Sequence, residues 1–461
     1  MKRGAIAAGA IVALASGLLA AQSKPAAKPL EIYVVDVEGG KADLFVTPSG
    51  QSVLVDTGFP IQGGVFRDVD RIMETIKAAG VTKLDYLVTT HYHLDHVGGL
   101  QELVTRIPVG TFVDHGPTTE DGVDGRQAEQ VRGFQAAYAE LYGKAKHIVV
   151  KVGDKLPLTG VDWRIVTSAG NVQRTAVPGA PGAGRPNAAC TGATRQPEAR
   201  DPDNGASVGS LITFGAFRLL DLADLTRDKE FDMMCPSNPL GTVDMFFASN
   251  HGSANANAPY LVHAVRPRVA IAQNGSGKGG SADFFRTLYD SPGFQDVWLT
   301  HWANPAGAEL NPAGVFIANG MDAAAIAATL TAPPRGGGPG GGRAGGAPVP
   351  GAGPAGAPGA PAPTAPAPPA PAPTAVPAPP AQAPAAGPAV AAPAPAAQAG
   401  VAAGGGGRAG GGGGRGAAQP PHVPAYWLKV TVQADGSFTV LNTRNNFSRT
   451  YPAAARAAAA R

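Results

Sequence analysis

Apolar and polar positions alternate in short runs along the first part of the chain, and these runs predict strands and one helix. Strands rich in β-branched and aromatic residues are predicted at 31–37, 43–47 and 52–58. Turns that contain glycine or proline separate them, which is typical of an antiparallel meander. The run at 70–79 instead repeats its apolar residues at helical spacing and is closed by Gly80, so it predicts a helix.

Strands and helices continue to alternate as far as residue 301. Further strands are predicted at 84–88, 111–113, 146–156, 163–168, 243–248, 268–273 and 297–300, with a hairpin within 207–224. Helical spacing recurs at 126–142, at 258–265 and from residue 284. A Gly-, Pro- and Arg-rich segment at 176–203 is predicted to be a long surface loop. This mixture indicates an α/β protein built as a layered sandwich.

The last third of the chain has a different composition, because from residue 333 to 421 it consists almost only of proline, alanine and glycine. Such a sequence lacks the apolar bulk to form a core, so we expect a disordered insertion at 333–424. Two strands, at 426–432 and 438–441, then predict a hairpin. An isolated hairpin is marginal in water, so we expect the segment 425–461 to dock on the core and end in a frayed tail. A separate binding tail is the alternative.

The amino-terminal segment indicates export. Two basic residues precede an apolar, Ala-rich run at 5–20 and the small residues around Ala21, which is the pattern of a secretory signal peptide at 1–21. An uncleaved membrane anchor is the alternative, although the run is short for a span of about 20 residues. We therefore expect a periplasmic or secreted protein with no membrane span after cleavage, whose main domain covers 22–332.

Charge and cysteine content narrow the possible chemistry. The formal net charge is +3, and it falls to +1 once Lys2 and Arg3 are removed with the signal peptide. A nearly neutral protein carries no electrostatic signature of nucleic-acid or membrane binding. The two cysteines, Cys190 and Cys235, lie in no CxxC motif or metal-ligand cluster. One disulfide fits an exported protein, and two free thiols are the alternative.

Three histidines and one carboxylate follow directly after the apolar run at 84–88. They fall within six residues, in the order His91, His93, Asp95 and His96. Imidazole and carboxylate ligands suit zinc and neighbouring divalent metals. Because side chains alternate in an extended segment, His91 and His93 face one side and the later two residues face a second position. The cluster predicts a site for one or two metal ions. A solvated polar turn, or histidines that bond nearby backbone, is the alternative.

The stretch HYHLDHVGG resembles the H-x-H-x-D-H signature of the metallo-β-lactamase-fold hydrolases. The resemblance implies the four-layer αββα sandwich of that family. It also implies that His91 and His93 bind one metal ion, and that Asp95 and His96 bind the other. We expect zinc as the cofactor, as one or two ions, with manganese or iron as alternatives.

Later segments resemble the rest of this family's site. Asp224 matches the aspartate that bridges the two metals, although Ala223 stands where glycine is usual. The segment 249–253 resembles the H-H-G-S motif of ComEC-type competence proteins, with Asn250 in place of the first histidine, so His251 is the expected ligand.

The opening at 34–58, VVDVEGGKADLFVTPSGQSVLVDTG, resembles the same ComEC-type branch. Asp56 within it ends a strand beside a glycine. An aspartate at this place can orient metal-bound histidines without binding the metal itself. The alternative is that Asp56 is only a turn residue.

The chain also departs from the family pattern. Lactamases and lactonases supply a further histidine to the first metal before the bridging aspartate, and the segment 201–207 has none here. This segment resembles the Asn/Ser version in the ComEC branch. The resemblance then implies a first metal held by His91, His93 and the bridging aspartate, with open positions that His115 or Asp203 would complete.

Three further residues are candidates for contacts outside the ligand set. His115 follows a strand and is a ligand, a substrate contact or a loop histidine. His301 is expected at the wall of the pocket or as a satisfied strand-end residue rather than a ligand. Asn250 weakens the second metal site if the family uses that position for a ligand.

Together these residues predict an exported metal-dependent hydrolase. A bound metal would lower the pKa of a water molecule and polarise the scissile carbonyl or phosphoryl group. Asp95 and Asp224 would position the metal and accept the proton of the water. The resemblance favours a phosphodiester or a related small ester as substrate, with a lactone or β-lactam as the alternative. A non-catalytic metal-binding protein of the cell envelope is the contrasting interpretation, favoured by Asn250 and the missing histidine.

Overall fold

The computed structural model describes residues 28–62, 64–118, 125–143, 145–319 and 426–454. All of them belong to one compact unit. Within the described ranges the chain forms two nine-stranded β-sheets and one two-stranded sheet. The signal peptide predicted at 1–21 and the insertion predicted at 333–424 lie outside the described residues.

The first sheet contains the predicted meander. In spatial order its strands are β20 (Ser448–Tyr451), β19 (Phe438–Asn442), β18 (Trp427–Val432), β1 (Leu30–Val35), β2 (Asp43–Val46), β3 (Ser52–Val55), β4 (Leu84–Val88), β5 (Val109–Asp114) and β6 (Lys146–Val149). Strands β1 to β3 are antiparallel, whereas β3 to β6 run parallel to one another.

The second sheet is formed by the later part of the chain. In spatial order its strands are β17 (Ile317–Asn319), β16 (Asp296–His301), β15 (Val269–Ala272), β14 (Met245–Phe247), β12 (Phe217–Asp221), β11 (Gly209–Phe214), β8 (Asp162–Ser168) and β7 (Lys155–Leu156), and β9 (Asn171–Val172) pairs with β8. Strands β12 and β14 to β17 are parallel. The two-stranded sheet pairs β10 (Arg185–Pro186) with β13 (Ser237–Asn238).

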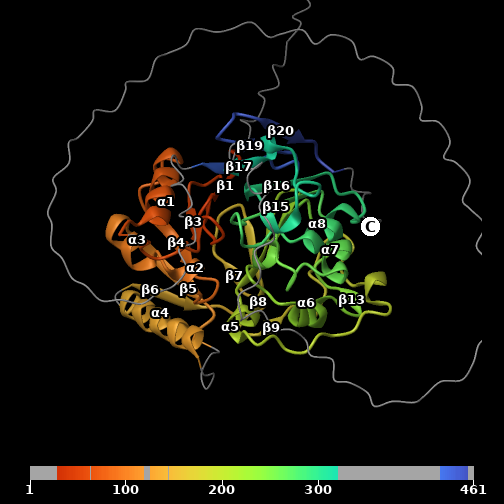
Figure 1. Ribbon diagram of the computed structural model, residues 1–461, viewed down its shortest axis with the longest axis horizontal. Coiled ribbons are helices and arrows are strands. Elements are labelled where there is room, and N and C mark those ends of the chain that lie inside the picture. The colour runs from red at the N-terminus through yellow and green to blue at the C-terminus, as the bar shows by residue number, and fades with distance from the viewer. Residues whose placement is uncertain (1–27, 63, 119–124, 144, 320–425, 455–461) are drawn as a thin grey trace, which may run out of the picture. The chain divides into compact units, whose positions relative to one another are not determined.

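Helices cover the outer face of each sheet. They are α1 (Arg67–Ala78), α2 (Leu94–Val97), α3 (Leu100–Arg106), α4 (Arg126–Tyr142), α5 (Pro202–Ala206), α6 (Arg227–Met234), α7 (Pro259–Val265) and α8 (Ala282–Tyr289), with 3₁₀ turns η1 (Ala188–Cys190), η2 (Ser249–Gly252), η3 (Asn304–Ala306) and η4 (Gly314–Phe316). Figure 1 shows α1, α3 and α4 on one side and α6, α7 and α8 on the other. None of the helices in the described part of the chain is long and apolar enough to cross a bilayer.

Three apolar layers hold this arrangement together. Side chains from both sheets fill the interior between them, where the rings of Phe45 and Trp163 meet edge to face with centroids 4.8 Å apart. A second layer packs the α1, α3 and α4 helices on the first sheet, and a third packs α6, α7 and α8 on the second sheet. The predicted αββα sandwich is therefore confirmed.

Two details of the sequence prediction are wrong. The single strand predicted at 146–156 is two strands, because β6 ends at Val149 and β7 begins at Lys155 in the other sheet. The backbone turns between them, with Asp154 N donating to the carbonyl of Lys151. The surface loop predicted at 176–203 ends earlier than predicted, because α5 begins at Pro202 and Asp203 within it is fully buried.

The C-terminal strands complete the first sheet. β18 pairs antiparallel with β1 along its whole length, and β19 and β20 follow outward. Trp298 Nε1 in the second sheet donates a hydrogen bond of 2.9 Å to Tyr451 Oη on β20. Asn442 Nδ2 donates a bond of 2.8 Å to the carbonyl of Ile317. These strands therefore close one end of the sandwich interior.

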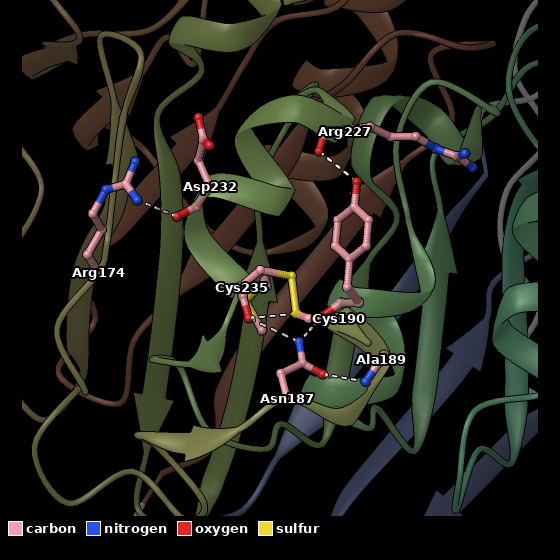
Figure 2. The surroundings of a disulfide bond; sticks show 9 residues. Arg174, Asn187, Ala189, Cys190, Arg227, Asp232 and Cys235 are labelled. Carbon is pink, nitrogen blue, oxygen red and sulfur yellow. Dashed lines mark hydrogen bonds between the residues drawn. A yellow bond between two sulfur atoms is a disulfide. The ribbon is translucent and has the colours of Figure 1, made fainter. Parts of the chain in front are cut away.

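A disulfide joins Cys190 in η1 to Cys235 at the end of α6, so the pairing favoured from the sequence is present (Figure 2). Next to it, Asn187 Nδ2 donates to the carbonyl of Met234 at 3.0 Å. Arg174 Nη1 donates to the carbonyl of Asp232 at 2.9 Å. The bridge and these bonds tie the long segment before α5 to the helices that cover the second sheet.

Candidate metal centre

The candidate site lies where parallel strands of both sheets end. β3 and β4 are parallel neighbours, so Asp56 after β3 lies beside the loop and α2 helix that follow β4. In the second sheet, β12 leads to Asp224, and its parallel neighbour β14 leads to His251 in η2. The carboxyl ends of parallel strands are the usual place for ligand-binding residues in α/β proteins.

Four side chains, Asp95, His96, Asp224 and His251, surround one point and are called the tetrad below. The Nε2 atoms of His96 and His251 are 3.3 Å apart. Asp95 Oδ2 lies 3.3 Å from His96 Nε2 and 3.1 Å from His251 Nε2. Asp224 offers one oxygen to each ring, with Oδ1 3.4 Å from His96 Nε2 and Oδ2 3.2 Å from His251 Nε2.

These separations fit a bound metal ion. Four ligand atoms at about 2.0–2.1 Å from a tetrahedral zinc ion would lie about 3.3–3.4 Å from one another. Each tetrad residue is at most 5% exposed, and burying two carboxylates is costly unless cations compensate them. A divalent cation would compensate them, and nitrogen with oxygen is a donor set that zinc accepts. In the described part of the chain, the tetrad is the one group of three or more His, Cys, Asp or Glu side chains that lie close enough together to hold a metal ion.

His91 and His93 present a second pair of nitrogen atoms beside the tetrad. His91 Nε2 lies 3.1 Å from His93 Nδ1. The centroids of the His91 and His96 rings are 4.1 Å apart, so the pair borders the tetrad directly. The tetrad thus offers one position with four protein ligands, and the nitrogen atoms of His91 and His93 lie next to it.

Asp56 and Thr90 fix the outer nitrogens of two of these histidines. His96 Nδ1 donates to Asp56 Oδ2 at 2.8 Å. The Thr90 hydroxyl also donates to Asp56 Oδ2, at 2.7 Å, so it is left to accept a bond from His91 Nδ1 at 3.1 Å. Each ring therefore turns its Nε2 toward the interior of the site, as metal-binding histidines do when a carboxylate holds the other nitrogen.

The other two histidines are held in the same way. His251 Nδ1 donates to the backbone carbonyl of Gln273 at 3.1 Å. His93 Nε2 lies 3.1 Å from Asp201 Oδ1, so Nδ1 is the nitrogen that remains for the site. All four rings thus have one nitrogen engaged by the protein and the other available to a cation.

The electrostatic field of the site favours a cation. Burial lowers the pKa of His96, but the carboxylates of Asp224 and Asp95 outweigh it and raise that pKa well above the usual value. Burial opposes ionisation of Asp224 and Asp95, yet the neighbouring positive charges hold both pKa values well below the usual range. Burial and the adjacent imidazoles lower the pKa of His91. The field that attracts a proton to this point would also attract a metal ion.

Left-handed backbone conformations surround the site. Asp56 has φ 60°, Ala223 φ 48°, Asn250 φ 48° and His251 φ 56°. Non-glycine residues adopt this region at an energetic cost and often do so at functional sites. Ala223 stands where the sequence resemblance led us to expect glycine, and its positive φ gives a physical reason why glycine suits this position.

Asn250 and His301, two of the predicted residues, lie outside the tetrad. Asn250 accepts a bond from Ser253 Oγ at 2.8 Å, and so stabilises the turn that carries His251. His301 is buried at the end of β16, where Nδ1 lies 3.2 Å from the carbonyl of Trp302. The interpretation of His301 as a strand-end residue agrees with this position.

His115 and Asp203, the residues expected to complete the first metal site, lie against each other. His115 Nε2 is 3.6 Å from Asp203 Oδ1, and neither ring nitrogen of His115 has a hydrogen-bond partner. Asp203 Oδ2 accepts a bond of 2.7 Å from the backbone nitrogen of Tyr92. Asp203 therefore holds the backbone between the two site histidines, and the described residues bring neither side chain into the tetrad.

The sequence did not single out three residues that contact the site. Asp201 and Gln273 position His93 and His251. The ammonium group of Lys278 contacts Asp95 Oδ2. Their partners are distant in sequence, so local patterns do not reveal them, although the glycine-rich stretch around Lys278 is a signal that could have been followed.

Comparison with known proteins agrees with this geometry. Residues 41–183 match the family model described as the metallo-β-lactamase superfamily, and this segment includes His91 to His96. The match covers less than a third of the chain, and the αββα sandwich agrees with the fold of that superfamily. The chain is also 23% identical over 253 residues to Recombination protein 2 of Haemophilus influenzae, which covers 55% of this chain and 25% of that protein. The chain thus spans about a quarter of the length of this curated relative.

The search of solved structures also found weakly similar chains. The metallo-β-lactamase fold protein YhfI from Bacillus subtilis has 13% identity and a TM-score of 0.33, over 59% of this chain and 96% of that one. CmlA, a diiron β-hydroxylase from Streptomyces venezuelae, has 16% identity and a TM-score of 0.35, over 59% of this chain and 52% of that one.

Asp56→Asn is expected to weaken zinc binding about 10- to 100-fold, the usual effect of losing a carboxylate behind a metal-bound histidine. The amide can still accept the bond of 2.8 Å from Thr90 N, but its NH₂ group would face the donating Nδ1 of His96. Competition with a chromophoric chelator measures the affinity. Asp85→Asn, which changes a carboxylate that accepts from Ser52 N, is the matched control. Equal affinity of the Asp56 variant and the wild type would contradict the role of Asp56.

Proposed function

We propose that this protein is an exported metal-dependent hydrolase that acts on a phosphodiester or a related ester. The observation that carries the proposal is the tetrad, in which two histidine nitrogens and two carboxylates meet at one point, with the nitrogens of His91 and His93 beside it. Each histidine has its other nitrogen occupied by the protein. A core that needed only packing would not require six polar side chains held in this way.

The chain's own residues would hold the metal and handle the proton. The tetrad would hold one divalent ion, and His91 with His93 would hold a second. A bound ion would supply Lewis acidity and lower the pKa of a water molecule. Asp95 and Asp224, both ionised, would orient that water and accept its proton. Burial of the tetrad would exclude bulk solvent and strengthen these interactions.

Zinc is the proposed metal, with manganese or iron as alternatives. The donor set contains imidazole nitrogens and carboxylate oxygens and no thiolate, which all three metals accept. The tetrad separations correspond to four-coordinate zinc, as described above. The metal is therefore to be identified by measuring which metal the purified protein contains, and not only by adding metals to the chelated protein.

The substrate class and the location rest on sequence resemblance. The ComEC-like features of the segments at 34–58 and 249–253 favour a phosphodiester over a lactone or β-lactam. The apolar run at 5–20 and the disulfide between Cys190 and Cys235 both support an oxidising compartment outside the cytoplasm.

Hydrolysis by the full-length protein tests the proposal. We expect bis(4-nitrophenyl) phosphate to be hydrolysed in the presence of zinc or manganese, and the rate to fall at least about 100-fold after chelation and in His93→Ala. A lactone and a chromogenic β-lactam measured in parallel test the alternative substrates. Metal binding without hydrolysis of any of these compounds would overturn the proposal and identify a metal-binding protein on the same fold.

A further inference from the structure

A glycine-rich loop at 275–280, between β15 and α8, packs against the backbone of the site. Gly280 N donates a bond of 2.9 Å to the carbonyl of His251. A Cβ atom on Gly279 would lie 2.1 Å from that same carbonyl, so only glycine permits this approach. On its other side, Gly275 is pressed against the backbone of Glu38, where an added Cβ would lie 2.5 Å from the carbonyl oxygen. The loop is therefore held close to the tetrad from two sides.

Lys278 is the charged residue that this loop presents to the site. Its ammonium group contacts Asp95 Oδ2, the oxygen that also faces the two tetrad histidines. The ammonium nitrogen lies 5.6 Å from the centroid of the Phe59 ring. A Cβ atom on Gly39 would lie only 3.2 Å from the Cβ of Lys278, which shows how closely the lysine stem follows the turn at Gly39.

The position of Lys278 differs from that of a buried structural lysine. Its side chain is 44% exposed, whereas that of Asp95 is 7% exposed. The lysine thus reaches from solvent to the edge of the tetrad. Asp95 also has two imidazoles as partners, so the lysine is one of several cationic neighbours of this carboxylate.

We propose that Lys278 binds an anionic oxygen of the substrate, of the phosphate type, at the entrance to the metal centre. This inference rests on the proposed function, because it specifies the charge of the substrate that the same site would accept. A lysine is a compact positive charge with three donors on a flexible stem, which suits a phosphate oxygen. A phosphoryl group that reaches the tetrad lies within reach of an ammonium group that contacts Asp95.

Binding of inorganic phosphate to the full-length protein, purified without chelator, tests the inference by calorimetry. We expect Lys278→Met to bind phosphate about tenfold more weakly than the wild type, the effect of losing one charged hydrogen bond. Lys278→Arg, which keeps the charge, is expected to stay within about threefold of the wild type. Lys155→Met is the matched control, because Lys155 is 48% exposed and also pairs with an aspartate, Asp162 at 2.8 Å.

Kinetics give a second, independent measurement. With bis(4-nitrophenyl) phosphate, Lys278→Met is expected to raise KM about tenfold, whereas with the uncharged ester 4-nitrophenyl acetate KM should not change. Unchanged phosphate affinity in Lys278→Met would overturn the inference.

The two proposals fail in different ways. Weaker phosphate binding in Lys278→Met, together with no hydrolysis of any ester, would support the anion site and overturn the proposed function. Hydrolysis of the phosphodiester with the same KM and phosphate affinity in Lys278→Met and the wild type would support the function and overturn the role of Lys278.

Discussion

His251→Ala is expected to remove the metal ion held by the tetrad and to lower the affinity of that position for zinc by more than about 100-fold. His251 Nε2 lies 3.1 Å from Asp95 and 3.2 Å from Asp224, so its loss leaves two buried carboxylates facing a single imidazole. Metal content per chain, measured on protein purified without chelator, shows the loss directly. If both positions are filled in the wild type, the content should fall from about two ions to about one.

His263→Ala is the matched control for this experiment. His263 lies on α7 and its Nε2 is 3.0 Å from the carbonyl of Thr287, outside the tetrad. The control should retain the metal content of the wild type. Equal metal content in His251→Ala and the wild type would show that the tetrad does not need His251. A wild type that holds no metal, even after zinc is added, would contradict the metal centre itself.

The sequence reveals the part of the site that is local. His91, His93, Asp95 and His96 stand within six residues after a strand, so alternation and ligand chemistry alone point to them. Asp224 and His251 each stand alone in their segments, and only family resemblance suggested them. The structure brings both to the same point because β12 and β14 are parallel neighbours and end together.

Contacts between distant segments could not be predicted from local patterns. Lys278 and Asp95 are 183 residues apart, and no periodicity connects them. The strands of the C-terminal hairpin were evident from their alternation, but their partner was not. The pairing of β18 with β1 depends on which edge the whole first sheet leaves open. The prediction of one strand at 146–156 was wrong for a related reason. Tertiary contacts, and not the local sequence, decide that β6 joins the first sheet and β7 the second.

Beneath the site, a buried lysine connects the two sheets. Lys41 Nζ lies 2.7 Å from Asp43 Oδ2 at the start of β2 and 3.0 Å from Asp221 Oδ2 at the end of β12. It also donates to Gln273 Oε1 at 3.0 Å, and the carbonyl of Gln273 holds His251. The lysine is 2% exposed, so these carboxylates have little access to water as an alternative partner.

Lys41→Met is expected to lower the free energy of unfolding by about 3–5 kcal/mol at neutral pH, because it leaves two buried carboxylates without their cation. Urea unfolding of the chelated protein measures this loss separately from any loss of metal. Lys429→Met is the control, since Lys429 pairs at 2.6 Å with the partly exposed Glu31 and its removal should cost only about 0–1 kcal/mol.

The loss in Lys41→Met is also expected to depend on pH. Burial raises the pKa of Asp43 to about 6 even though Lys41 opposes the shift, so removing the lysine should raise this pKa further. A carboxyl whose pKa is higher in the folded state than in the unfolded state favours folding when protonated, and this contribution is lost as the pH rises above the unfolded value of about 4. The deficit of Lys41→Met relative to wild type should therefore be small near pH 4 and largest above pH 7. A deficit of equal size at both pH values would mean that lost packing of the lysine stem, and not the unpaired charge, destabilises the variant.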